Sequence, residues 1–248
     1  MTLSPVASMS RRRLLVPVLI VLTLCVGRAG FAPAPAMAVD HQYVVVVDAG
    51  HQGKANLKRE PIGPGSRLKK PAVAGGTSGV VTHNAESLIN LRVALRLRTQ
   101  LQARGVKVIM IRTSQKANVA NSRRALIANA ANADLLIRLH CDAAGSKNRG
   151  VLTLIPGRNK WTGPILAQSA LAGSAVHKAV VATTGAKNRG IRRRTDMSGF
   201  NWSNVPCVIV EMGVMTNRAD DRLLASPGYQ NKLATGMSNG VMNYLSTR

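Results

Sequence analysis

Two histidines and two glutamates stand where side chains could perform chemistry, each beside a run of apolar residues. His51 follows VVVVDAG, His140 follows DLLIRL, and Glu211 follows PCVIV. Glu86 lies in HNAESLINL, where an apolar helical pattern begins. Two imidazoles and a carboxylate form a common zinc site that leaves one position open for water. A further carboxylate that does not bind the metal can serve as the general base of a hydrolase.

Taken alone, some of these residues also have a plain structural interpretation. His51 could be an ordinary loop histidine with a hydrogen-bond partner. Glu86 could simply compensate the dipole of the helix that it opens. Glu211 is harder to explain, because a charge that follows VIV in a buried strand is costly unless it is paired or bound. The chemical interpretation therefore depends on whether the fold brings the four residues together.

Apolar runs alternate with amphipathic segments along the chain and indicate the elements that carry these residues. Such alternation predicts a single α/β domain around a mixed, mostly parallel sheet flanked by helices. Ligands bind at the C-terminal ends of the strands in such sheets, where the two histidines and Glu211 would lie. The expected strands are 44–47, 106–112, 134–142, 150–157 (which could be an edge strand) and 206–213, with 190–194 a short strand or a loop, and the expected helices are 84–105, 117–133, 163–184 and 229–244.

Residues 54–81 form a long segment, rich in Gly, Pro and Lys, between His51 and Glu86. It is too long for an ordinary connection, which indicates either a functional lid or a disordered insertion. It also has few residues that could anchor it in a core. We therefore hypothesise a lid-like flap, such as a hairpin, that moves over the cleft. The alternative is an inert surface insertion.

The first 38 residues have the pattern of a cleaved secretory signal. Arginines at 11–13 precede an apolar stretch at 14–27, and AMA at 36–38 is a small-residue cleavage site. The apolar stretch is short and contains a proline, so we expect no stable membrane anchor. The SRRRLL segment fits a twin-arginine signal and a plain secretory signal equally. We expect export to the periplasm, the cell wall or the medium, with residues 39–248 as the catalytic domain.

The charge of the chain points to a polyanionic partner. The whole chain has a formal charge of +24, and removal of residues 1–38 would leave 30 basic against 10 acidic residues, a charge of +20. Nucleic acid, anionic lipid and acidic cell-wall polymer are all possible partners of such a surface. Export, few aromatic residues and the lack of a base-reading motif argue against nucleic acid. We expect binding to anionic wall polymer.

Four further polar or charged features of the sequence have roles that depend on where the fold places them. Asp48 could orient His51 or cap the turn that follows it. The basic run from Arg189 to Arg194 could bind acidic substrate groups or be solvated. Glu60 is expected in solvent and His177 at the surface.

Two cysteines of the mature chain, Cys141 and Cys207, fall in predicted strands. Export permits a disulfide between them. The expected register places them at different heights in the sheet, and a disulfide needs Cα atoms within roughly 7 Å. The pairing stays open at this point.

Four ordered motifs carry a resemblance to a known family: VVVDAGHQG, HNAESLINL, RRALIANAANADLLIRLHCDA and VIVEMGVMTN. Together they resemble the zinc-dependent N-acetylmuramoyl-L-alanine amidases of the amidase type 3 family, over 44–244. The resemblance implies a phosphorylase/hydrolase-like fold. It also implies hydrolysis of the amide between N-acetylmuramic acid and L-alanine of peptidoglycan. One Zn²⁺ per chain would be bound by His51, Glu86 and His140, with Glu211 as the catalytic glutamate.

The resemblance also sets the expected partners and the rival functions. Peptidoglycan and muramyl-peptide fragments would be the substrates, and we expect a monomer. Arg138, where the family more often has serine, and Val214, in place of an aromatic residue, depart from the pattern and put contacts with the peptide stem in doubt. A zinc carboxypeptidase acting on stem peptides would use the same four groups. A cell-wall-binding protein without turnover would not need all of them.

Overall fold

The structure is a computed structural model that describes residues 42–248. The expected signal sequence, residues 1–38, lies outside these residues. The strands are β1 (Val44–Ala49), β2 (Asn56–Pro61), β3 (Lys69–Val73), β4 (Lys107–Met110), β5 (Leu135–Asp142), β6 (Val151–Pro156), β7 (Asn188–Arg194) and β8 (Cys207–Val214). The helices are α1 (Glu86–Gln102), α2 (Asn121–Ala130), the 3-10 helix η1 (Gly163–Ile165), α3 (Leu166–Thr184), α4 (Ser198–Asn201), α5 (Arg218–Ala225) and α6 (Pro227–Leu245).

Six strands form one sheet in the order β4-β1-β5-β8-β6-β7. All neighbouring strands in it are parallel except β6 and β8, which are antiparallel. This confirms the expected mixed, mostly parallel sheet. The suggestion that 150–157 is an edge strand is wrong, because β6 pairs on both sides. The arginine-rich β7 takes that edge instead, where charged side chains discourage pairing with another chain.

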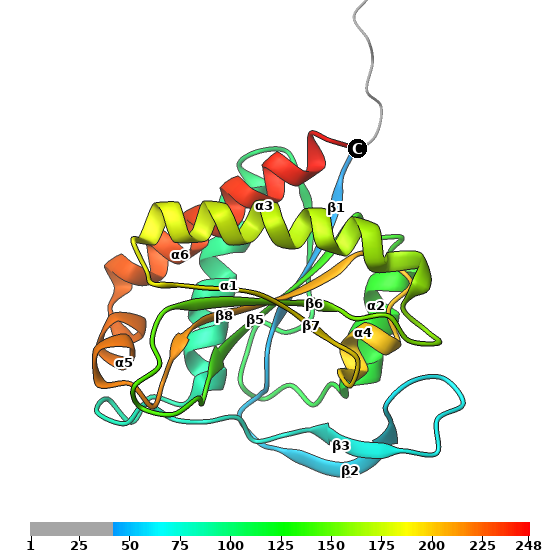
Figure 1. Cartoon of the computed structure of the whole chain (residues 1–248), viewed down its shortest axis with the longest axis horizontal. Helices are drawn as coiled ribbons and strands as arrows, with labels where there is room; N and C mark the ends of the chain where they lie inside the picture. The colour runs from blue at the N-terminus through cyan, green and yellow to red at the C-terminus, as the bar shows by residue number, and fades with distance from the viewer. Residues whose placement is uncertain (1–41) are drawn as a thin grey trace, which may run out of the picture. The chain divides into compact units, whose positions relative to one another are not determined.

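Helices cover both faces of the sheet (Figure 1). α3 and α6 lie together across one face, and α1 packs against α6, β1 and β5. α2 and α4 contact each other on the opposite face. Val45 and Val47 of β1 belong to the core under α1, α3 and α6, whereas Val46 belongs to the core under α2. The run of valines is continuous because all three are fully buried, on one face or the other.

The segment between His51 and Glu86 contains the antiparallel hairpin β2–β3. Its expected lack of anchors is wrong. Glu60, expected in solvent, accepts a hydrogen bond from the backbone N–H of Ser122 at 3.0 Å, at the start of α2. The Trp202 indole donates to the carbonyl of Pro61 at 2.9 Å, and Ile62 is buried. The hairpin is thus tied to α2 and to the residues that follow α4, and its movement over the cleft stays a prediction.

Long apolar helices were predicted better than short ones. α3, preceded by η1, was expected as one helix, and by length and composition it is apolar enough to cross a membrane. It packs against α6 and β6, so we interpret it as a core helix. α4 and α5 were not predicted. Asn217, in the loop after β8, caps α5 by accepting hydrogen bonds from the N–H groups of Ala219 and Asp220 at 3.0 and 3.2 Å.

Two further expectations are settled by burial and register. His177 is buried, so its expected surface position is wrong. Its ring bridges the hydroxyl of Thr153 at 3.0 Å and the side-chain oxygen of Asn188 at 2.8 Å, which lets a polar ring sit in the core. Cys141 and Cys207 are both buried and free. Cys207 is in register with Leu136, five residues before Cys141 on β5, so the strands hold the two thiols apart.

Candidate active site

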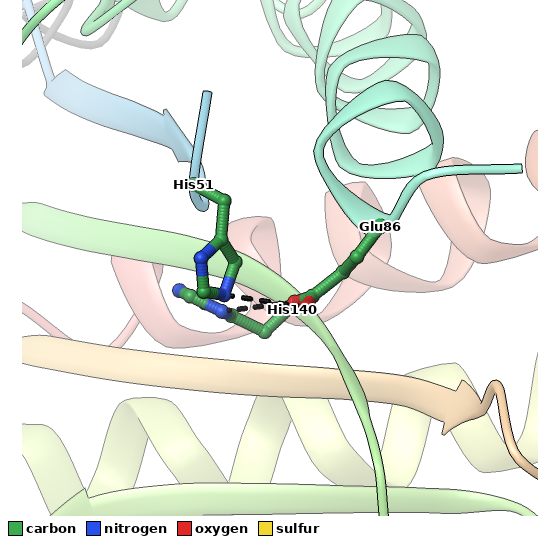
Figure 2. Close-up of side chains that lie close together, drawn as sticks. All are labelled: His51, Glu86 and His140. Carbon is green, nitrogen blue, oxygen red and sulfur yellow. Dashed lines mark hydrogen bonds and ion pairs between the residues drawn. The ribbon is translucent and has the colours of Figure 1, made fainter. Parts of the chain in front are cut away.

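The structure brings His51, Glu86 and His140 together at one end of the sheet. His51 lies in the turn after β1, Glu86 is the first residue of α1, and His140 is on β5. One nitrogen or oxygen atom from each residue lies within 4.8 Å of the others. The Glu86 carboxylate is central: Oε2 lies 3.2 Å from His51 Nε2, and Oε1 lies 3.2 Å from His140 Nδ1. Figure 2 shows the two rings and the carboxylate pointing toward one another.

The backbone that carries His51 is held in a strained conformation. Its φ is 56°, in the left-handed region that residues other than glycine rarely adopt. Two buried arginines hold the carbonyl groups of Gly50 and His51. Arg112 Nη2 donates to the carbonyl of Gly50 at 3.0 Å, and Arg124 Nη2 donates to the carbonyl of His51 at 3.0 Å. A Cβ atom at Gly50 would lie 2.4 Å from the His140 ring, so only glycine fits there. Such over-determined strain is common at functional sites.

The Glu86 carboxylate is anchored on both sides. Oε2 accepts a hydrogen bond from the N–H of Thr77 at 3.1 Å, and Oε1 accepts one from the N–H of Cys141 at 3.1 Å. Burial alone would raise the pKa of Glu86, but hydrogen bonds from His140 and His51 outweigh it and hold this pKa well below its usual range. The group is therefore a fixed anion, as a metal ligand must be.

Hydrogen bonds also set which imidazole nitrogens are free to bind a metal. The Nδ1–H of His51 donates to the carbonyl of Ala74 at 2.8 Å, so Nε2, which faces Glu86, is the nitrogen of this ring that would bind a metal. In His140, Nδ1 faces Glu86, and the buried Nε2 has no hydrogen-bond partner among residues 42–248. Burial lowers the pKa of His140, which favours its neutral form. Burial would lower the pKa of His51 as well, but the hydrogen bond to Glu86 and the charge of Glu86 outweigh burial and raise this pKa, so a metal at Nε2 of His51 would displace a proton.

Glu211 lies on β8, directly beside His140 in the parallel register of β5 and β8. Paired residues in such a sheet point to the same face, on strands roughly 4.8 Å apart. Within the described part of the chain, its buried Oε2 has no hydrogen-bond partner. Burial, together with the charges of Glu86 and Asp142, raises the pKa of Glu211 to about 8. This carboxyl group can therefore take up a proton readily near neutral pH.

Asp48 contacts His51 only indirectly, through Arg124, and its own partners are arginines. It is fully buried and binds two buried arginines, with Oδ1 2.5 Å from Arg124 Nη1 and Oδ2 2.7 Å from Arg138 Nε. Within residues 42–248, Asp48 forms no hydrogen bond or ion pair with the ring of His51. Sequence reasoning missed this trio, although Arg138 stands in an apolar strand run and needed a buried partner. Arg124 links the trio to the carbonyl of His51.

A cavity of about 240 Å³ opens beside the two histidines. The hairpin β2–β3, β5 and the start of α4 contribute to its walls. It is lined by His51, Lys70, Pro71, Val73, Ala74, Asn121, Arg138, His140, Asp196, Met197, Ser198 and Gly199. The basic run on β7 lies outside this lining and is only partly solvated: Arg189 pairs with Asp142 at 2.7 Å and Arg194 with Asp196 at 2.8 Å.

Comparison with known proteins gives consistent matches. The sequence pattern of a family described as N-acetylmuramoyl-L-alanine amidase matches residues 45–243. N-acetylmuramoyl-L-alanine amidase Rv3717 of Mycobacterium tuberculosis is 30% identical over 220 residues, which cover 83% of this chain and 87% of that protein. Crystal structures of the N-acetylmuramyl-L-alanine amidase Ami1 from Mycobacterium smegmatis and Mycobacterium abscessus are both 26% identical, with TM-scores of 0.75 and 0.73. They cover 83% and 82% of this chain, and this chain covers 98% of each.

Proposed function

The chain belongs to the N-acetylmuramoyl-L-alanine amidase family, and from this premise we infer that it is a hydrolase of peptidoglycan. The bond cleaved is the amide between N-acetylmuramic acid and the L-alanine that begins the stem peptide. The observation that carries this proposal is the convergence of two imidazoles and one carboxylate within 4.8 Å, from three distant parts of the chain. A cell-wall-binding protein without turnover would not need such a set.

We assign one zinc ion per chain to His51, Glu86 and His140. The fit rests on the donor set itself: a fixed carboxylate and two imidazoles, one with a buried nitrogen that lacks any partner in the described chain. When bound, zinc polarises a carbonyl and lowers the pKa of a bound water to about 7. The remaining work falls to the residues of this chain.

Glu211 is assigned the proton transfers. Its carboxylate would accept the proton of the attacking water and later donate it to the nitrogen of the departing alanine. Two features support this role: a buried Oε2 without a partner in the described chain, and a pKa raised to about 8. Glu211 pairs with His140 across β5 and β8 and is not among the three residues whose ligand atoms converge, which supports a role apart from metal binding.

The test combines zinc analysis with the products of wall digestion. Purified protein should contain about one zinc per chain, as expected for a single site of this ligand type. Mass spectrometry of digested peptidoglycan should show free stem peptides that begin with L-alanine. His140→Ala should lose both the metal and the release of peptides. Release of single C-terminal residues would indicate a carboxypeptidase instead, and full zinc retention in His140→Ala would contradict the ligand assignment.

The cellular setting of the reaction is also a proposal. We propose that residues 1–38 direct export and that residues 39–248 act as a monomer at the cell wall. The excess of basic residues, 34 Lys and Arg against 10 Asp and Glu in the full chain, supports attraction to anionic wall polymer. We also propose that the hairpin β2–β3 limits access to the cavity, because Lys70, Pro71 and Val73 line it.

A further inference from the structure

A buried positive charge lies beside the proposed metal ligands. Asp48 is the single carboxylate bound to both Arg124 and Arg138, so these three buried groups carry one net positive charge. Taking such a charge out of water is costly unless it is compensated. The two arginines differ in their surroundings: Arg124 is enclosed, whereas Arg138 lines the cavity. The excess charge is therefore available to a ligand through Arg138.

One end of the Arg138 side chain has no protein partner. Its Nε donates to Asp48 at 2.7 Å and its Nη2 donates to Asn121 at 2.8 Å. No hydrogen bond is formed by Nη1 within residues 42–248, although only 3% of Arg138 is exposed. Nη1 lies against Gly199, where a Cβ atom would come within 1.9 Å of it. The guanidinium is thus fixed on two sides, with free N–H groups at the cavity.

The other charges that line the cavity do not compensate Arg138. Lys70 and Asp196 pair with each other across the rim at 3.0 Å. Met197, Pro71 and Val73 contribute no charge. A rigid guanidinium in such a setting recognises carboxylates, because its planar N–H groups match their two oxygens.

The strand spacing relates Arg138 to the reacting bond. Arg138 and His140 are two residues apart on β5, so they share a face and lie roughly 6.6 Å apart along the strand. An extended peptide advances roughly 3.3–3.6 Å per residue. A group on the second residue of the stem peptide would therefore lie near Arg138 when the bond before the first residue lies at the metal ligands.

We propose that Arg138 is a specificity-determining residue that binds the free α-carboxylate of the residue following L-alanine in the stem. This inference rests on the proposed amidase function and adds to it the substrate form that the enzyme prefers. The sugars of peptidoglycan are uncharged, so a carboxylate partner must come from the peptide. An amidated α-carboxyl group would leave the net charge at Arg138 uncompensated.

The test uses two isomeric substrates with the same net charge. N-acetylmuramoyl-L-alanyl-D-glutamine has a free α-carboxylate, and the D-isoglutamine isomer has an α-amide and a free γ-carboxylate. We expect a preference on the order of tenfold to hundredfold in kcat/KM for the D-glutamine isomer, the range of hydrogen bonds to charged groups. The difference should lie mainly in KM, because the contact is made before and during reaction. Equal values, or the reverse preference, would overturn the proposal.

Variants locate the source of the preference. Arg138→Gln should bring the ratio of the two kcat/KM values close to one. Gly199→Ala should reduce the ratio as well, because its Cβ would displace Nη1 without removing the charge. Arg192→Gln, an exposed position on β7 outside the cavity lining, is the matched control and should keep the full ratio. An equal loss in Arg192→Gln would contradict the assignment. If Arg138→Gln does not fold, the ratio of the two kcat/KM values in the wild type and in Gly199→Ala still tests the proposal.

Binding separates this inference from the amidase assignment. Calorimetry with L-alanyl-D-glutamine and L-alanyl-D-isoglutamine measures the same preference without turnover. Tighter binding of the D-glutamine dipeptide would support the carboxylate site even if no wall amide were hydrolysed. Hydrolysis of both muramyl isomers at equal rates, with equal dipeptide affinities, would reject Arg138 and leave the amidase function standing.

Discussion

Replacement of Arg124 by methionine should destabilise the fold and weaken the metal site together. Arg124 is fully buried and donates to Val119 O at 2.8 Å, Asp48 Oδ1 at 2.5 Å and His51 O at 3.0 Å. Removing one partner of a buried ion pair costs about 3–5 kcal/mol. Arg138 still pairs with Asp48 in this variant, which favours the lower end of that energy range. The carbonyls of Val119 and His51, which lose a donor, add about 1 kcal/mol each. We expect a loss of about 5 kcal/mol in the free energy of unfolding.

Urea unfolding with the metal chelated measures this loss without a contribution from metal binding. With a slope of roughly 2 kcal/mol per molar urea, the midpoint should fall by about 2.5 M. Arg123→Met is the matched control, because the neighbouring Arg123 is exposed on α2, and it should change stability by no more than about 0.5 kcal/mol. Metal affinity of Arg124→Met should fall about 10- to 100-fold, because Arg124 holds the carbonyl of His51.

The effect of Arg124→Met should also depend on pH. Burial would raise the pKa of Asp48, but Arg124 and Arg138 outweigh it and hold this pKa well below its usual range. A carboxyl group with a lowered folded-state pKa stabilises the fold above its unfolded pKa of about 4, and this stability is lost as pH falls below that value. Wild-type protein should lose more stability than Arg124→Met on acidification below pH ~4, so the difference between them should shrink. A variant within about 1 kcal/mol of wild type at pH 7 would refute the reasoning.

Three further predictions concern catalysis, the wall and the hairpin. Glu211→Ala should keep zinc and wall binding while kcat falls by roughly 10² to 10⁴, since general acid–base catalysis contributes that much; near-normal turnover would mean that another group is the base. Sedimentation with purified wall should weaken steeply as salt rises, because surface charges are screened, and salt-independent binding would point to a specific carbohydrate pocket. Replacing 58–71 by a two-residue Asn-Gly turn removes most of the hairpin but keeps the paired ends Asn56 and Val73. The ratio of rates on intact wall and on small muramyl peptides should change, whereas an unchanged ratio with zinc retained would indicate an inert insertion.

The convergence of His51, His140 and Glu86 could be predicted because parallel strands end at a common edge. The buried trio around Asp48 could not. The charge of Asp48, at the end of an apolar run, shows that a partner must exist. Nothing near Asp48 in the sequence identifies this partner as Arg124, which lies 76 residues further along the chain. The role of Glu211 rests on the family resemblance, and the fold adds the burial of its Oε2 and its position beside His140.

Other differences have equally physical causes. β6 looked like a possible edge strand because an apolar run of six residues is the same for edge and inner strands until its partners are known. The hairpin looked unanchored because its anchors are side chains elsewhere, such as Trp202 and Ser122, bound to its backbone carbonyl or to its one glutamate. The short helices α4 and α5 have too few turns for a periodic pattern to be distinct.

The wide separation of the three ligands along the chain determines when a metal can be bound during folding. His140 and Glu86 are 54 residues apart, and β1 must pair with β5 before His51 reaches either of them. In the unfolded chain these three ligands therefore form no local chelate, and metal should bind to them together only after the central strands have assembled. A metal that binds at this late stage cannot nucleate folding, so refolding should proceed at the same rate with and without zinc. Its stabilising effect should appear as slower unfolding.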